Sequence, residues 1–271
     1  AMRGVIYASN AAPPDCRPMT LAPAPPPAHT DKRRYVREMF SAIAPRYDLL
    51  NHLLSLNIDR SWRRKAVGRL EWEAHGPGRF LDACAGTLDL AAELAKRRGF
   101  SGRVIAVDFA APMLRRGAGK GAEGMVRAVA ADALELPFRD GAFDGVTVGF
   151  GVRNLEDVDA GLRELHRVLK MGSRLVVLDF TTPPFALLRA LYYLYFRFIL
   201  PLVGRLISGH PTAYAYLPAS VAEFPPPRAL ARRMEGAGFR DCDFRLLTGG
   251  IARAEEPTSE LPAHLKGVWR G

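Results

Sequence analysis

Four acidic residues mark where this 271-residue chain could do chemistry, because each ends a short apolar run that predicts a buried strand. They are Asp82, Asp108, Asp132 and Asp179. In an open α/β sheet, ligands bind outside the carboxyl ends of the strands, so we expect these carboxylates at one edge of a sheet. Phosphates bind to helix amides and cations and are repelled by carboxylates. Four acids at the strand ends therefore argue against a cofactor that carries a pyrophosphate.

The loop after the first of these strands, FLDACAGTLDLA (80–91), supports the same interpretation. A dinucleotide-binding loop has the spacing Gly-x-Gly-x-x-Gly, whereas this loop offers Gly86 alone. S-adenosylmethionine carries a sulfonium, an ammonium group and ribose hydroxyls but no pyrophosphate, so a loop that holds it needs fewer glycines. We expect Asp82 to attract the ammonium group, directly or through water, and Gly86 to let the backbone pass close to the ligand.

The next two strand ends complete this predicted cofactor site. Asp108 would accept hydrogen bonds from both ribose hydroxyls, as the acid about 20 residues past the loop does in dinucleotide-binding folds. Asp132 with Ala133 would meet the adenine edge. Each acid could instead cap the helix that follows it, but all of them together favour a cofactor site.

A second candidate segment, GFGVRN (149–154), ends the fourth predicted strand. Arg153 is a fixed cation that, beside a bound cofactor, could stabilise an oxyanion or lower the pKa of a phenol. In the structural alternative, Arg153 pairs with a carboxylate such as Asp157 and holds the loop. Asn154 follows it directly.

Strand-like and helix-like segments must alternate to bring these residues together, and the sequence predicts that they do. Strands are expected at 79–83, 103–108, 125–132, 143–150 and 174–180, helices at 88–98, 111–120 and 157–170, and a final antiparallel hairpin at 239–254. The pattern predicts an α/β fold: a mostly parallel seven-stranded sheet with helices on both faces.

The composition narrows the range of partners. A formal net charge of +10 is compatible with nucleic acid, an anionic membrane surface or an acidic substrate. No aromatic RNA-binding motif accompanies the charge, so we expect no nucleic-acid partner. Three cysteines without Cys-x-x-Cys spacing indicate a reducing compartment, and neither they nor the six histidines predict a metal site.

Several blocks of the sequence resemble the ubiquinone/menaquinone biosynthesis C-methyltransferases. They are MFSAIAPRYDLLNHLLSLNIDRSWRR (39–64), LPFRDGAFDGVTVGFGVRNLED (136–157), LRELHRVLKMGSRLVVLDFTTP (162–183), LPLVGRLISG (200–209), AYAYLPASVAEFP (213–225) and LLTGGIA (246–252). The resemblance implies a Rossmann-like class I methyltransferase that uses S-adenosylmethionine. Its substrate would be a ring carbon of a polyprenylated quinol, most often demethylmenaquinol.

The resemblance also assigns roles to individual residues. Thr87, Asp108 and the pair Asp132–Ala133 would contact the cofactor, and Tyr47, Arg153 and Asn154 would face the quinol. We expect Arg153 to stabilise the developing phenolate, Asn154 to orient the ring, and Tyr47 to position the hydroxyl or relay its proton through water. No histidine offers itself as the base.

The composition and the resemblance together divide the chain into three parts. We expect a disordered, proline-rich tail over residues 1–30, one methyltransferase domain over 31–254 and a C-terminal tail over 255–271. Within the domain, residues 31–75 would form a helical cap on the substrate side. Residues 183–225 would form a helical lid that binds the isoprenoid tail.

The aromatic segment 185–207 bears on location. Three arginines and Pro201 interrupt it, so we expect two helices broken near Pro201 rather than a membrane span. It could contact a membrane surface peripherally, with lid packing on the domain alone as the alternative. A cytoplasmic protein at the inner face of the membrane would result, and a homodimer is left open.

Two other functions remain open from the residues. One is methylation of a soluble phenolic metabolite, against which the matching blocks at 39–64 and 200–225 argue because they belong to the substrate side. The other is a non-catalytic homologue in a quinone-synthesis complex. Ala85 and Leu88, where the family usually has glycine, favour that function.

Overall fold

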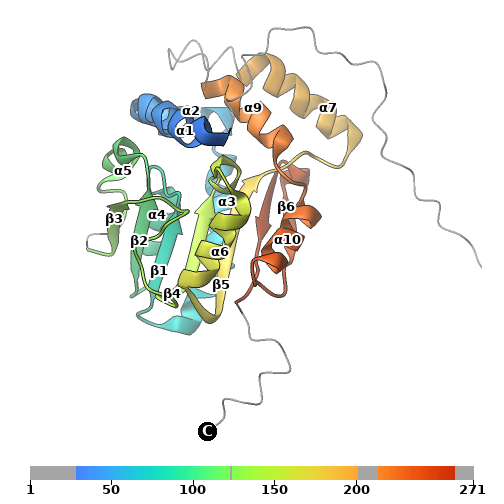
Figure 1. The fold of residues 1–271 in the computed structure, drawn as a ribbon. Helices are drawn as coiled ribbons and strands as arrows, with labels where there is room; N and C mark the ends of the chain where they lie inside the picture. Colours follow the sequence, from blue (N-terminus) through green and yellow to red (C-terminus); the bar gives the residue numbers. More distant parts are fainter. Residues whose placement is uncertain (1–28, 123, 201–212, 260–271) are drawn as a thin grey trace, which may run out of the picture.

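A seven-stranded sheet forms the centre of the computed structural model, which describes residues 29–122, 124–200 and 213–259 (Figure 1). Its strands are β1 (Arg79–Ala83), β2 (Arg103–Asp108), β3 (Val126–Ala130), β4 (Phe143–Gly149), β5 (Leu169–Phe180), β6 (Phe244–Leu247) and β7 (Ala252–Glu255). The order is β3-β2-β1-β4-β5-β7-β6. The first five strands pair in parallel and β7 runs antiparallel to both neighbours, which confirms the predicted fold class.

The strand boundaries follow the apolar runs closely, with one clear difference. Strands β1 and β2 have the predicted bounds, whereas β5 begins at Leu169 instead of Arg174. The preceding helix ends at Val168, and Leu169 already pairs with Phe143 on β4. The chain therefore passes directly from helix to strand, and the register between β4 and β5 is irregular between Phe143 and Gly145.

Helices cover both faces of the sheet because side chains alternate along each strand. The helices of the described residues are α1 (His29–Ile43), α2 (Tyr47–Leu54), α3 (Ile58–Val67), α4 (Asp89–Ala95), α5 (Ala111–Gly117), α6 (Val158–Val168), α7 (Ala186–Leu194), α9 (Ala213–Glu223) and α10 (Pro227–Gly236), with the short turns η1 (Ala44–Arg46), η2 (Trp72–His75), η3 (Val152–Asn154), η4 (Tyr195–Ile199) and η5 (Thr248–Gly250). One core lies under α6 and α10, around Leu81 and Val177. The other lies under α3 and α4, around Phe80 and Val176.

A third group of helices forms a cap. Helices α1, α2, α7 and α9 gather at one end of the sheet, at the top of Figure 1. Their shared core includes Val36 and Leu50 from the N-terminal helices and Tyr192, Phe196 and Tyr216 from the later ones. Two segments far apart in the sequence, the expected cap and the expected lid, thus pack into one layer.

Two expectations concern the later helices and the C-terminal end. The break expected near Pro201 lies outside the described residues, although the helix already widens to a π-helical turn over Tyr195–Ile199. Residues 257–259 still form backbone hydrogen bonds with β5, so the sheet continues past the expected domain end at residue 254.

None of the helices in the described parts of the chain has both the length and the apolar composition needed to cross a membrane.

Candidate active site

Two cavities adjoin at the carboxyl ends of the parallel strands, beneath the cap. The first encloses about 60 Å³ and is lined by the loops after β1, β2, β3 and β4 together with α1. The second encloses about 320 Å³ and lies among α2, α3, α7, η4 and α9. Phe40, Tyr47 and Phe150 line both. These three aromatic side chains therefore form a wall between the cavities.

Asp108 is fixed at the first cavity by backbone amides. Its carboxylate accepts hydrogen bonds from the N–H of Gly86 at 2.8 Å and of Ala110 at 2.8 Å, and burial raises its pKa. Gly86 lines the same cavity and has φ +51°, a left-handed conformation that glycine adopts without strain. The loop after β1 and the end of β2 are thus tied together at the cavity.

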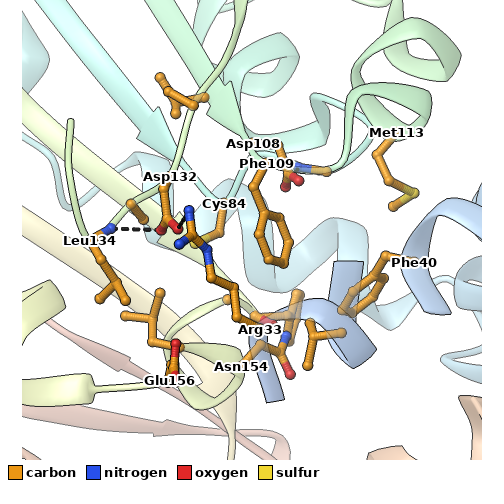
Figure 2. Close-up of a pocket in the computed structure, with 18 of the residues that line it drawn as sticks. Arg33, Phe40, Cys84, Asp108, Phe109, Met113, Asp132, Leu134, Asn154 and Glu156 are labelled. Atoms are coloured by element: carbon orange, nitrogen blue, oxygen red, sulfur yellow. Dashed lines mark hydrogen bonds and ion pairs between the residues drawn. The ribbon is translucent and has the colours of Figure 1, made fainter. Parts of the chain in front are cut away.

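Asp132 and Ala133 also line this cavity. Asp132 Oδ1 accepts a hydrogen bond from the N–H of Leu134 at 2.9 Å, and Oδ2 lies 2.6 Å from Nη2 of Arg33. Arg33 comes from α1 and reaches across the cavity to Asp132 in Figure 2. Arg33 was not predicted as a site residue, because nothing in its local pattern distinguishes it from the other basic residues of that helix.

The size of the first cavity bears on how a ligand enters. Pockets that hold ligands of drug size enclose about 300–1,000 Å³, far more than the space found here. The Arg33–Asp132 ion pair closes one side, and Phe40 of α1 faces Met113 on the other (Figure 2). A molecule as large as S-adenosylmethionine thus requires α1 or the Arg33 side chain to move.

Two residues expected at the cofactor do not line the first cavity. The buried carboxylate of Asp82 accepts hydrogen bonds from the N–H of Ala91 at 3.0 Å and from Thr147 Oγ1 at 3.0 Å. Burial raises the pKa of Asp82 to about 7. Direct attraction of an ammonium group by Asp82 is therefore not what the geometry supports: the carboxyl caps α4, which was the alternative for each acid.

Thr87 also differs from its expected position. Its hydroxyl donates to Asp48 Oδ1 at 2.5 Å and ties the loop to α2 instead of facing the cavity. Leu88 adopts φ +66° and is buried, with its side chain above Gly117. The bulk of Leu88 thus fills the protein core and leaves the first cavity unobstructed.

The second cavity is mainly apolar. Its lining includes Trp62, Phe180, Leu188, Leu191, Tyr192, Tyr195, Phe196, Leu200 and Leu217. Large apolar side chains beside it are exposed to solvent, from Leu53 and Leu56 on one side to Phe185, Leu187 and Phe198 on the other. Such a cavity suits a ring with an apolar substituent.

Arg153 lines the second cavity and pairs with a carboxylate, as the structural alternative expected, but the partner is Asp179 and not Asp157. Its Nη1 donates to Asp179 Oδ1 at 2.6 Å and to the carbonyl of Phe150 at 2.6 Å. Asp157 was the wrong partner, because its carboxylate instead caps α6 by accepting from the N–H of Ala160 at 2.9 Å. The Nε of Arg153 is buried and has no hydrogen-bond partner among the described residues. Within the described parts of the chain, the Nε is therefore an unused donor.

Tyr47 and Asn154 lie at the wall and in the first cavity. Tyr47 lines both cavities and is hydrogen-bonded to Asn51, and burial raises its pKa. Asn154 lines the first cavity, where Nδ2 donates to the carbonyl of Phe150 at 3.1 Å and Oδ1 accepts from Tyr216 at 3.1 Å. Arg153 and Asn154 are neighbours in sequence, yet their side chains serve different cavities.

The chain matches a known protein family over most of its length. The ubiE/COQ5 methyltransferase family matches residues 28–256. A demethylmenaquinone methyltransferase of Thermus thermophilus is 51% identical over 218 residues, 79% of this chain and 96% of that protein. The ubiquinone/menaquinone biosynthesis C-methyltransferase UbiE of Geotalea daltonii is 44% identical over 227 residues, 82% and 95% of the two chains.

The fold has solved counterparts. A SAM-dependent methyltransferase from Thermotoga maritima superposes with a TM-score of 0.55 at 17% identity, over 82% of this chain and 99% of that one. At this identity the likeness concerns the fold. It agrees with the seven-stranded sheet described above.

Proposed function

This chain belongs to the ubiE/COQ5 methyltransferase family and is an S-adenosylmethionine-dependent methyltransferase, and we propose that it methylates a ring carbon of a polyprenylated quinol, demethylmenaquinol above all. The observation that carries the proposal is the pair of cavities with a shared aromatic wall. One cavity has the carboxylates that suit a cationic donor. The other has the apolar lining that suits a quinol ring and the start of its tail.

The donor would occupy the first cavity. S-adenosylmethionine supplies an electrophilic methyl group on a sulfonium when it is bound. Asp108 would hold the ribose hydroxyls, Asp132 and Ala133 would meet the adenine, and Gly86 would leave room for the ligand. The aromatic faces of Tyr47 and Phe150 would attract the positive charge at the wall.

The acceptor would occupy the second cavity. Carbon becomes a sufficient nucleophile when the neighbouring hydroxyl loses its proton, and the ring must be reduced because a quinone ring is electron-poor. Arg153, held by Asp179, would stabilise the phenolate through its free Nε. Tyr47 would position the hydroxyl. Asn154 lines the first cavity, so it would orient the ring indirectly, through its hydrogen bond with Tyr216, which lines the second cavity.

The exposed apolar residues beside the second cavity support a peripheral membrane contact. Leu187, Phe198 and Leu56 are 77%, 58% and 77% exposed, and a lipid-soluble substrate has to reach the cavity beside them. Flotation with vesicles that contain anionic lipid tests this contact. We expect Leu187→Glu with Phe198→Glu to reduce flotation at low and high salt, while unchanged flotation would contradict a role for this patch.

The substrate proposal is tested by one assay with three acceptors. Purified protein and labelled S-adenosylmethionine would be incubated with reduced demethylmenaquinol, with a reduced benzoquinol analogue and with a small soluble phenol. We expect incorporation into the prenylated quinols and into demethylmenaquinol fastest. Faster methylation of the soluble phenol would contradict the proposal and favour a methyltransferase of phenolic metabolites.

A further inference from the structure

A strip of polar side chains crosses the otherwise apolar second cavity. It consists of Tyr47, Asn51, Ser55, Asp59 and Arg63, which recur at four-residue intervals along α2 and α3 and all line the cavity. An apolar ring and tail need no such groups. Their presence indicates a polar reaction partner, and all of them except Tyr47 have no role in the site as proposed so far.

Asp59 has the most connected position in this strip. Oδ1 of its carboxylate accepts from Ser55 Oγ at 2.6 Å, and Oδ2 lies 2.9 Å from Nδ1 of His52 and is bonded by Nη1 of Arg63. Asp59 is only 3% exposed, whereas the His52 side chain is 24% exposed. The hydrogen-bonded pair of Asp59 and His52 therefore connects the lining of the second cavity to the solvent.

The surrounding charges keep Asp59 ready to accept a proton. Burial raises the pKa of Asp59, but the hydrogen bond from Ser55 and the guanidinium of Arg63 act against burial, and the pKa lies below its ordinary value. Beyond Arg63, the carboxylate of Asp89 at the start of α4 lies 3.2 Å from Nη2.

We propose that Asp59 is the general base that takes the hydroxyl proton of the quinol, and that His52 passes this proton to the solvent. The inference rests on the proposed function, because it assigns the base for that reaction. It also supplies the histidine that the sequence pattern did not reveal: His52 works behind Asp59 and does not line the cavity.

The step balances in atoms and charge. The quinol O–H bond breaks towards Asp59, the ring carbon forms a bond to the methyl group, and the electron pair of the broken C–S bond stays on sulfur. The ring carbon then loses its own hydrogen as the oxygen regains a proton, so one proton per turnover must leave. With its proton on Nε2, neutral His52 accepts that proton at Nδ1 and releases the other to water.

Variants of Asp59 test the assignment through rate and pH profile. We expect Asp59→Asn to lower kcat about 10²-fold or more, while the Kd of S-adenosylmethionine stays within about twofold. Asp59→His places a different base at the same position and should recover part of kcat. Its activity should then fall below about pH 6.5, higher than the acid limb of the wild type. His52→Gln should give a smaller loss of about tenfold.

Asp144→Asn is the matched control, because Asp144 also faces a histidine but lies at the opposite edge of the sheet. Its carboxylate bonds Lys170 and the N–H of Arg79 and lies 4.0 Å from His75. This variant should keep wild-type kcat and the wild-type pH profile. Melting temperatures of all variants separate loss of the base from loss of the fold.

Two results would overturn the inference. An Asp59→Asn protein with full kcat on demethylmenaquinol, or an Asp59→His protein with an unchanged pH profile, would remove Asp59 as the base while leaving the proposed function intact. A wild type that methylates no quinol would overturn the proposed function and this inference with it.

Discussion

The two cavities differ in how the chain builds them. The first consists mainly of strand ends and their following loops, and its polar groups are held by backbone amides two to four residues past a strand. The second consists of helix faces from segments more than a hundred residues apart, such as Tyr47 and Tyr192. A donor site of the first kind depends on local backbone geometry, whereas an acceptor site of the second kind depends on tertiary packing.

Their electrostatics differ in the same sense. Around the first cavity the carboxylates of Asp108, Asp132 and Glu156 outnumber the guanidinium of Arg33, whereas around the second cavity Arg63 and Arg153 outnumber Asp59. A methyl transfer from a sulfonium to a phenolate needs these two environments side by side. The account therefore predicts that variants in one cavity change one function and leave the other intact.

The largest expected effect is that of Arg153→Ala in the second cavity. We expect kcat to fall about 10²–10³-fold because the phenolate loses its charged donor. The Kd of S-adenosylmethionine, measured by calorimetry, should stay within about twofold. Arg153→Lys controls for the buried charge of Asp179, which alanine would leave unpaired. Turnover unchanged in the alanine variant would eliminate the role assigned to Arg153.

Asp108→Asn should have the opposite effect: it should weaken donor binding and leave turnover largely unchanged. A hydrogen bond to a charged group contributes about 1.5–3 kcal/mol, so we expect the Kd of S-adenosylmethionine to rise about 10- to 100-fold. The kcat at saturating donor should change much less. Unchanged donor affinity would mean that Asp108 only braces the loop through Gly86 and Ala110.

Tyr47→Phe tests the shared wall and should have a moderate effect. The ring that separates the cavities stays, and only the hydroxyl that bonds Asn51 is lost. We expect kcat to fall about two- to tenfold, in line with one neutral hydrogen bond, with little change in the Kd of the donor. If donor affinity falls instead, Tyr47 belongs to the first cavity and the division between the cavities is wrong there.

The smallest expected effect is that of Arg33→Ala, which removes the ion pair across the first cavity. The Arg33 side chain is 57% exposed, so the pair stabilises the closed arrangement by about 1 kcal/mol at most. We expect association of S-adenosylmethionine in stopped-flow experiments to accelerate by up to about fivefold. Slower association would show that Arg33 helps to capture the donor.

Much of the first cavity could be predicted from sequence, because it follows from where strands end. The runs RFLDA (79–83) and RVIAVD (103–108) form strands with those bounds, and Asp108 lies where the pattern puts it. Asp82 does not line this cavity, and the sequence carried a signal for its actual position. It shares the sheet face of Phe80, two residues earlier, and that face packs under α4, so its carboxyl caps the helix.

The second cavity could be predicted only in part. The partner of Arg153 follows from topology: β4 and β5 pair in parallel with Gly149 opposite Leu178, which brings Asp179 to the start of the GFGVRN loop. The approach of Tyr216 to Asn154 and of Arg33 to Asp132 has no local cause in the sequence. Such contacts depend on how the cap helices pack, which no periodicity reveals.

The position of the donor tests the division into two cavities most directly. A crystal structure with S-adenosylhomocysteine, the demethylated product, is predicted to show the ribose at Asp108, the Arg33–Asp132 pair separated, and the sulfur facing the wall of Phe40, Tyr47 and Phe150. A ligand in the second cavity, or a sulfur that points away from this wall, would contradict the account.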